Sequence, residues 1–426
     1  MKKGLFLLIV FLPFSFIGNA QVIEYARTVV NTLGSEEFKG RGYVDGGDKL
    51  AADYIRQEFE KHNLKSFTKN YFQSFKTPVN TFPNKITLKI NGKNLQAGSD
   101  FLVEAGSPKV KGVFEVISIS AEDLLTDERL IPKLQQSSGK FQIIEPFNKE
   151  DFTKEELDRI NGVTGFLKYH ENNPAEGTII LTMEKLTWSG STTEFPNPGI
   201  TIHADSISGP IKHIEIDLKN KFHKNYKTQN VIGFVEGENS DSAIVFIAHY
   251  DHLGMLGPDA VFTGANDNAS GVAMLLSLAK FYAENNPKYS TVFIAFGAEE
   301  LGLVGSRYFT ENPLFDLSTI KFLINFDISG TGDDGIQVVN GSVYKDEFDL
   351  LTELNKKHQL LPQIKIRGEA CNSDHCMFDR QNVPNFYIYT LGGISAYHDI
   401  YDRPETLPLT EFEDYFTLIT RFIEKL

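Results

Sequence analysis

The feature that most constrains the fold of this chain is residues 244–271, which read IVFIAHYDHLGMLGPDAVFTGANDNASG. The first five residues form an uninterrupted apolar run, which is typical of a strand buried on both faces of a parallel sheet. His249 and Asp251 follow this run, and a loop containing Gly and Pro leads to Asp267 before an apolar helical run begins. In an open α/β sheet, ligands bind beyond the carboxyl ends of the strands. The stretch therefore predicts one half of a metal site.

The same alternation of apolar strands and helices continues through the carboxyl-terminal part of the chain. Apolar runs at 291–296, 320–326 and 386–390 predict further buried strands, and runs at 348–358 and 410–425 predict helices. Strands that alternate with helices indicate an α/β protein with a parallel sheet. We therefore expect a three-layer α/β/α sandwich with a mostly parallel central sheet.

A stretch of different character interrupts this pattern. Residues 98–213 hold short β-like runs separated by polar segments that contain Pro or Gly, so we expect a small β-rich domain inserted into the main one. The main domain would then comprise residues 21–97 and 214–426. The predicted strands of the insert are residues 112–119, 140–144, 163–169, 178–183 and 199–203.

The amino-terminal residues 1–20 have the pattern of a signal peptide. Two Lys precede an apolar run, and Gly18-Asn19-Ala20 supplies small residues at a cleavage site. The apolar run is shorter than the roughly 20 residues that cross a bilayer. We therefore expect export to the periplasm or the cell exterior, with no membrane contact after cleavage. The net charge of −14 argues against nucleic acid and anionic membranes as partners.

The chain contains two Cys residues, Cys371 and Cys376. Cys residues of an exported protein often pair, but pairing depends on a geometry that the sequence does not show. A local disulfide and two free thiols both remain open at this point.

Ligand-type side chains follow each of the predicted buried strands. Two imidazoles together with several carboxylates suit a borderline metal such as Zn²⁺. Because close carboxylates cannot all stay ionised unaided, two divalent cations that share a carboxylate would account for so many acidic groups. In chain order the candidates are His249, Asp267, Glu299, Glu300, Asp327 and His398.

Each candidate alone has an ordinary explanation. Asp267, flanked by two Asn, could cap the helix that follows it. Glu299 and Glu300 could be a solvated pair in a loop, and a single His at a strand end is usually an ordinary loop residue. The coincidence of these residues at successive strand ends favours the metal site.

These residues resemble the co-catalytic zinc aminopeptidases, whose superfamily also includes glutamate carboxypeptidases and glutaminyl cyclases. A looser resemblance links the insert, through PGITI at 198–202, to the protease-associated domain of longer members. The motifs that match the family are FKGRG at 38–42, AHYDHLG at 248–254, GANDNASG at 264–271, GAEELG at 297–302, NFD at 325–327, SDH at 373–375 and YHD at 397–399.

The resemblance implies a site that holds two zinc ions per chain. Asp267 would bridge the two ions. His249 and Asp327 would complete the first position, and Glu300 and His398 the second. The family likeness also implies a non-proline cis peptide after the bridging residue, between Asp267 and Asn268.

The resemblance assigns further roles around the metals. Glu299 would be the general base, and Asp251 would orient His249 from behind, as metal-bound imidazoles usually require. Asp374, His375 and Tyr397 are candidates for the lining of a substrate pocket.

The implied activity is that of an aminopeptidase, which hydrolyses the amino-terminal bond of peptides with a free amino terminus by means of a metal-bridging hydroxide. A glutaminyl cyclase would use a single zinc held by Asp267, Glu300 and His398, and the presence of His249 and Asp327 favours two metals. A carboxypeptidase would need a cationic group for the terminal carboxylate of its substrate. A receptor-like relative without catalysis would have lost ligands, and this chain keeps all of them.

Overall fold

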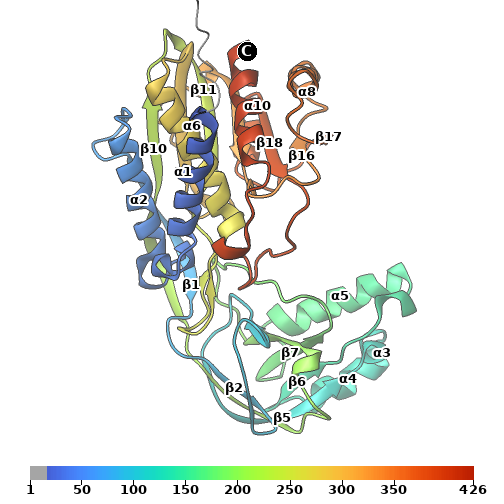
Figure 1. Ribbon diagram of the computed structural model, residues 1–426. Coiled ribbons are helices and arrows are strands. Elements are labelled where there is room, and N and C mark those ends of the chain that lie inside the picture. Colours follow the sequence, from blue (N-terminus) through green and yellow to red (C-terminus); the bar gives the residue numbers. More distant parts are fainter. Residues whose placement is uncertain (1–16) are drawn as a thin grey trace, which may run out of the picture.

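The computed structural model describes residues 17–426, so residues 1–16 of the predicted signal peptide lie outside the described chain. Two sheets of eight strands each form the cores of two lobes, which lie end to end in Figure 1. We call them the main sheet and the second sheet. The main sheet has the order β1-β10-β14-β11-β15-β18-β16-β17, and the second has the order β3-β2-β9-β5-β6-β7-β8-β4.

The main sheet is mixed, with a parallel centre. The four neighbouring strands β14, β11, β15 and β18 are parallel to one another, whereas β10 and β16 run antiparallel to their neighbours β14 and β18. The strands of this sheet are β1 (Phe72–Thr81), β10 (Lys221–Val235), β11 (Asn239–His249), β14 (Tyr289–Phe296), β15 (Ile320–Phe326), β16 (Ile336–Val339), β17 (Ile364–Ile366) and β18 (Asn385–Thr390).

Helices cover both faces of the main sheet. In β11, Ile244 and Phe246 contact the core beneath one set of helices, while Val245 and Ile247 join a core on the opposite face. This alternation follows from the two-residue period of a strand and confirms the predicted three-layer α/β/α sandwich. The first face carries α1 (Ile17–Leu33), α2 (Gly47–Lys61), α6 (Gly271–Glu284), α8 (Lys345–His358) and α10 (Phe412–Lys425), and the second carries α7 (Val304–Glu311) and α9 (His375–Asp379).

The carboxyl ends of the parallel strands face the second lobe. Strand β10 enters the main sheet from that lobe at Lys221 and pairs antiparallel with β14, so β14 ends at the same edge. Strands β11, β15 and β18 run in the direction of β14 and also end there. The edge that the sequence marked with ligand-type residues is therefore the edge next to the second lobe.

The second lobe is larger than the predicted insert. Strands β2 and β3 precede residue 98, and β9 extends to Leu218, yet all three belong to the second sheet. From the sequence, their residues are expected in the main domain, because alternation shows that a run is a strand but not which sheet it joins. The elements of this lobe are β2 (Thr87–Ile90), β3 (Lys93–Leu95), β4 (Phe101–Val103), β5 (Val110–Ile119), β6 (Phe141–Ile144), β7 (Gly177–Thr182), β8 (Gly199–His203), β9 (His213–Leu218), α3 (Ala121–Leu124), α4 (Asp127–Gln135) and α5 (Lys154–Tyr169).

The predicted strand at residues 163–169 is wrong, because these residues form the last turns of α5. Thr153 and Glu156 begin this helix with a capping box, in which each side chain accepts a hydrogen bond from the backbone of the other. Ile160 and Leu167, seven residues apart, are buried on one face of the helix. The helical spacing of the apolar residues outweighs the β-branched and aromatic composition of the segment.

Cys371 and Cys376 form a disulfide, with their Cα atoms 4.9 Å apart. The bond closes the short loop before α9, and so answers the question that the sequence left open. Within residues 17–426, no helix combines the length and the apolar character needed to cross a bilayer.

A buried carboxylate joins the first two helices. Glu58 of α2 accepts a hydrogen bond from Tyr25 of α1 at 2.5 Å and one from Lys61 at 3.0 Å. Burial opposes ionisation of Glu58, but hydrogen bonds from His62, Tyr25 and Lys61 outweigh it and lower the pKa of the carboxyl from 4.5 to about 2.

We predict that Glu58→Gln lowers the free energy of unfolding at pH 7 by about 1–2 kcal/mol, after allowing for solvent screening of a half-buried pair. A carboxylate with a depressed pKa stabilises the fold above its unfolded value of 4.5, and that contribution is lost as the pH falls through about 2. Urea unfolding at pH 7 and pH 3 should therefore show a smaller difference between wild type and variant at pH 3. Glu60→Gln, which removes an exposed ion pair with Arg56 on the same helix, is the control. A difference that stays constant with pH would contradict the prediction.

Candidate metal centre

His249 stands at the end of β11 and is almost completely buried. Its Nδ1 lies 3.1 Å from the backbone oxygen of Asp251, and because a carbonyl only accepts, Nδ1 must donate. Nε2 is then free, and it lies 3.4 Å from both Asp267 Oδ1 and Asp327 Oδ1. The backbone oxygen of Asp251 is thus the hydrogen-bond partner that orients His249, whereas its carboxylate oxygen Oδ1 lies 3.9 Å from Nδ1.

The carboxylate of Asp251 fixes the neighbouring strand end instead. It accepts hydrogen bonds from the backbone N–H groups of Glu299 at 3.0 Å and Glu300 at 3.4 Å, and from the hydroxyl of Tyr43 at 3.0 Å. Asp251 therefore ties the end of β11 to the end of β14, where the two Glu residues begin their turn.

Asp267 lies at the middle of the cluster, in the turn of Ala265–Ser270 that precedes α6. The peptide bond between Asp267 and Asn268 is cis, which confirms the prediction made from the family resemblance. Oδ1 of Asp267 faces His249, and Oδ2 lies 3.0 Å from Nε2 of His398. One carboxylate thus faces an imidazole on each side, as a bridging ligand must.

The remaining two carboxylates each have one oxygen held by a neighbouring side chain. Oε1 of Glu300 lies 2.7 Å from His252, and Oε2 lies 3.3 Å from His398. Oδ2 of Asp327 accepts a hydrogen bond from Ser373 at 2.8 Å, and Oδ1 faces His249. Each carboxylate therefore presents its other oxygen to the centre of the cluster.

The structure gives each of the three predicted pocket residues a different environment. Neither carboxylate oxygen of Asp374 has a hydrogen-bond partner among the described residues, and burial raises its pKa to about 7. His375 donates through Nε2 to the backbone oxygen of Ala370 at 2.7 Å, and its ring stacks on Tyr387. Burial lowers the pKa of this imidazole to about 4. Tyr397 is half-exposed and stacks on the ring of His398, with centroids 4.0 Å apart.

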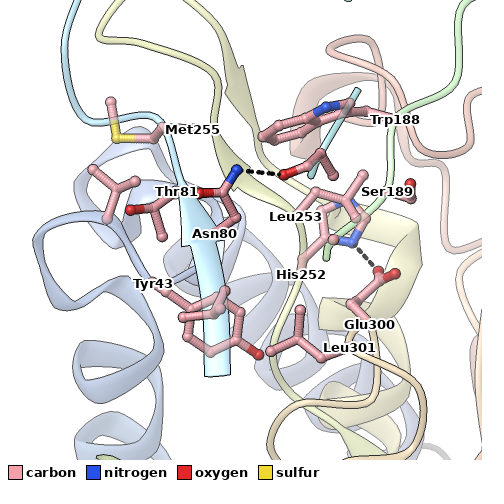
Figure 2. A pocket seen from close by; sticks show the side chains of 14 residues that line it. Tyr43, Asn80, Thr81, Trp188, Ser189, His252, Leu253, Met255, Glu300 and Leu301 are labelled. Atoms are coloured by element: carbon pink, nitrogen blue, oxygen red, sulfur yellow. Dashed lines mark hydrogen bonds and ion pairs between the residues drawn. The ribbon is translucent and has the colours of Figure 1, made fainter. Parts of the chain in front are cut away.

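Glu300 also lines a cavity between the two lobes (Figure 2). Figure 2 shows His252 and Glu300 joined on one wall of this cavity, with Trp188 of the second lobe close by. Tyr43, Asn80 and Leu301 are among the other residues that line it. None of the three predicted pocket residues is part of this lining.

The residues present fit a pair of divalent cations. His249, Asp267 and Asp327 offer ligand atoms that all lie within 4.8 Å of one another, and so do His252, Asp267 and Glu300. His398 approaches the second group through Nε2. Imidazole nitrogens and carboxylate oxygens are the ligands of zinc sites. One nitrogen or oxygen of each of four side chains, those of His249, His398, Glu300 and Asp327, already has a hydrogen-bond partner. The other nitrogen or oxygen of each side chain is therefore directed into the space that they share.

Sequence reasoning missed two buried residues that support this cluster. The guanidinium of Arg41 donates to the backbone oxygens of Leu33, Tyr250, Thr263, Gly264 and Asp267 at 2.6–3.1 Å. The carboxylate of Asp402 accepts from the backbone N–H groups of Asn266 and Asp267 at 2.8 and 2.9 Å. In the sequence, the FKGRG motif at 38–42 was the feature from which a role of Arg41 could have been predicted.

Comparison with known proteins gives one family and several relatives. Residues 230–423 match the model of Peptidase family M28. Aminopeptidase YwaD of Bacillus subtilis (strain 168) is 30% identical over 197 residues, which are 43% of this chain and 42% of YwaD. The match therefore spans less than half the length of this curated relative.

Two solved structures resemble nearly the whole chain. One is BSAP, a zinc aminopeptidase from Bacillus subtilis, with a TM-score of 0.67 and 20% identity over 94% of each chain. The other is the aminopeptidase from Aneurinibacillus sp. strain AM-1, with a TM-score of 0.63 and 19% identity over 96% of each chain. At these identities the likeness concerns the fold, and it agrees with the sandwich described above.

The family expected from the sequence motifs is thus confirmed. The matched segment includes every ligand-type side chain of the cluster, from His249 to His398. Over residues 230–423, this chain is therefore similar to Peptidase family M28.

Proposed function

We propose that this chain is a zinc-dependent aminopeptidase that removes amino-terminal residues from peptides, with two zinc ions per chain. The observation that carries the proposal is the convergence of two imidazoles and three carboxylates from separate strand ends, whose facing atoms lie 3.0–3.4 Å apart. The names of the relatives support the same activity, since YwaD is an aminopeptidase and BSAP a zinc aminopeptidase.

Five side chains would hold the two ions. Asp267 would be shared, because its two oxygens face opposite sides of the cluster. His249 and Asp327 would complete the first position, and Glu300 and His398 the second. Bound zinc lowers the pKa of water from 15.7 to about 7 and polarises a carbonyl that it contacts.

Glu299 is the proposed general base. It follows β14 next to Glu300, and its backbone N–H is held by Asp251. Burial is the main cause that raises the pKa of Glu299 well above its ordinary value, and the nearby carboxylates raise it further. A carboxylate with a raised pKa can accept a proton from the attacking water and later deliver it to the leaving amine.

The proposed metal site suits the free amino group of a peptide. The described side chains of the cluster include the four carboxylates of Asp267, Glu299, Glu300 and Asp327. The buried Arg41 donates its hydrogen bonds to backbone oxygens and not to these carboxylates. Two bound divalent cations would offset the charge of these carboxylates, and one of the cations would hold the free α-amine of the substrate while the other polarises the scissile carbonyl.

The same proposal includes export of the chain. The disulfide between Cys371 and Cys376 supports it, because such bonds persist in oxidising compartments outside the cytosol. The substrates would then be peptides of the periplasm or the surrounding medium.

We predict that Glu299→Gln lowers kcat by about 10²–10⁴-fold, because the amide cannot accept a proton, while the zinc content stays that of the wild type. Steady-state kinetics on an aminoacyl-nitroanilide and metal analysis of the same sample measure both quantities. Glu311→Gln, at the end of α7 and away from the cluster, is the control. Wild-type turnover in Glu299→Gln would exclude this residue as the base.

We predict that metal analysis finds two zinc ions per chain, and that a chelator abolishes turnover until zinc is restored. A value of one zinc, together with cyclisation of an amino-terminal glutamine, would instead indicate the glutaminyl cyclase alternative. Absence of bound zinc in a folded sample would refute the proposed function.

We predict that acetylation of the substrate's amino terminus abolishes cleavage, because an amide nitrogen, unlike a free amine, has no available lone pair for the proposed metal site. Mass spectrometry of one peptide with a free and with an acetylated terminus makes the comparison. Cleavage at internal bonds of the acetylated peptide would show an endopeptidase and contradict the exopeptidase proposal.

A further inference from the structure

A segment of the second lobe reaches into the metal centre. Residues 185–190, which we call the strap, follow β7 and leave the second sheet before β8 begins. The indole of Trp188 anchors the strap to its own lobe, since its Nε1 donates to the backbone oxygen of Val103 in β4 at 2.7 Å. Its ring lies 4.8 Å from that of Phe262, in the segment of the main domain between β11 and α6. Figure 2 shows Trp188 and Ser189 above His252 and Glu300.

The strap holds the ring and the backbone of His398. The backbone N–H of Trp188 donates to the carbonyl of His398 at 2.8 Å, and the carbonyl of Trp188 lies 2.9 Å from Nδ1 of the imidazole. Because that carbonyl only accepts, the proton of the neutral ring must be on Nδ1, and Nε2 keeps its lone pair. Nε2 is the atom that faces Asp267 and Glu300.

Lys185 holds the loop that carries His398. Its ammonium group contacts the carbonyls of Ser395 at 2.7 Å and Tyr397 at 3.1 Å and the carboxylate of Asp399 at 2.5 Å. His398 itself has a φ of 52°, a conformation that residues with a side chain adopt rarely and only when surrounding contacts impose it. The strap supplies such contacts on both sides of this residue.

The other end of the strap lies against Glu300. A Cβ atom added to Gly190 would be 2.7 Å from Cδ2 of Leu301 and 2.9 Å from the backbone oxygen of Glu300. The strap therefore lies against both His398 and Glu300, the two residues that would complete the second metal position. The supports of the first position come from the main domain, because Asp251 orients His249 and Ser373 holds Asp327.

We propose that the strap is a positioning element for the Glu300 and His398 metal position, so that the second lobe controls the affinity for one of the two zinc ions. This inference rests on the proposed function, since it assumes that both positions bind zinc. Outer partners of metal ligands typically contribute 10–100-fold to metal affinity. Loss of strap contacts should therefore weaken the second position by that factor and leave the first unchanged.

The test titrates the metal-free chain with Zn²⁺ in competition with a chromophoric chelator. Lys185→Met removes the ammonium group from a half-exposed side chain, and Gly190→Ala introduces the Cβ that meets Glu300 and Leu301. Lys149→Met, which breaks an exposed ion pair with Glu184 in the same lobe, and Gly162→Ala, where a Cβ meets nothing within 4 Å, are the matched controls. Circular dichroism verifies that each variant is folded. If Gly190→Ala is not folded, the result for Lys185→Met alone decides the test.

The expected result is one zinc bound with wild-type affinity and one bound about 10–100-fold more weakly in both strap variants, with controls that match the wild type. Anomalous X-ray scattering at the zinc edge should find the weak ion between Glu300 and His398. Two unchanged affinities in Lys185→Met, or an equal loss at both positions, would overturn the role of the strap while leaving the proposed function intact. A wild-type chain that binds no zinc would overturn the proposed function and this inference with it.

Discussion

Repulsion between buried carboxylates is the constraint on which the rest of the site depends. Asp267, Glu300 and Asp327 direct oxygens into one small space, and two unit charges about 4 Å apart near a protein surface repel by ~4 kcal/mol. The buried guanidinium of Arg41 attracts Asp267 and Glu300, but all five of its N–H donors go to backbone oxygens, so it donates no hydrogen bond to either carboxylate. Negative charge therefore remains for cations to neutralise. The contacts described above hold each of the three carboxylates in position.

That positioning relies on backbone oxygens and on partners that are distant in sequence. A carbonyl determines which nitrogen of each ligand imidazole carries the proton, from Asp251 for His249 and from Trp188 for His398. Arg41 connects the amino-terminal segment to the turn that carries Asp267, and its own burial lowers its pKa to about 10. A carbonyl adds no net charge, so it can orient an imidazole without adding to the repulsion that the metals must overcome.

The sequence predicted the ligand cluster because that cluster depends on strand ends. Parallel strands bring their carboxyl ends to one edge whatever their exact pairing, so His249 and Asp327 could be placed together without knowing the register. The supporting contacts depend on details that a linear pattern does not encode. Trp188 is 210 residues from its partner His398, and His252 could be recognised as a neighbour of Glu300 only once the loop after β11 was folded. The helical state of residues 163–169, the last part of α5, was missed for a different reason, since their β-branched and aromatic composition was given more weight than the helical spacing of Ile160 and Leu167.

The topology explains why the second lobe became part of the site. It is inserted between β1 and β10, an antiparallel pair at the edge of the main sheet. Because β10 is also antiparallel to β14, the point where the insert leaves and re-enters must lie at the edge where the parallel strands end. Any domain inserted there is next to the ligands. The strap reaches His398 from the segment between β7 and β8, so the place of insertion accounts for how the second lobe could exert the proposed control of one metal position.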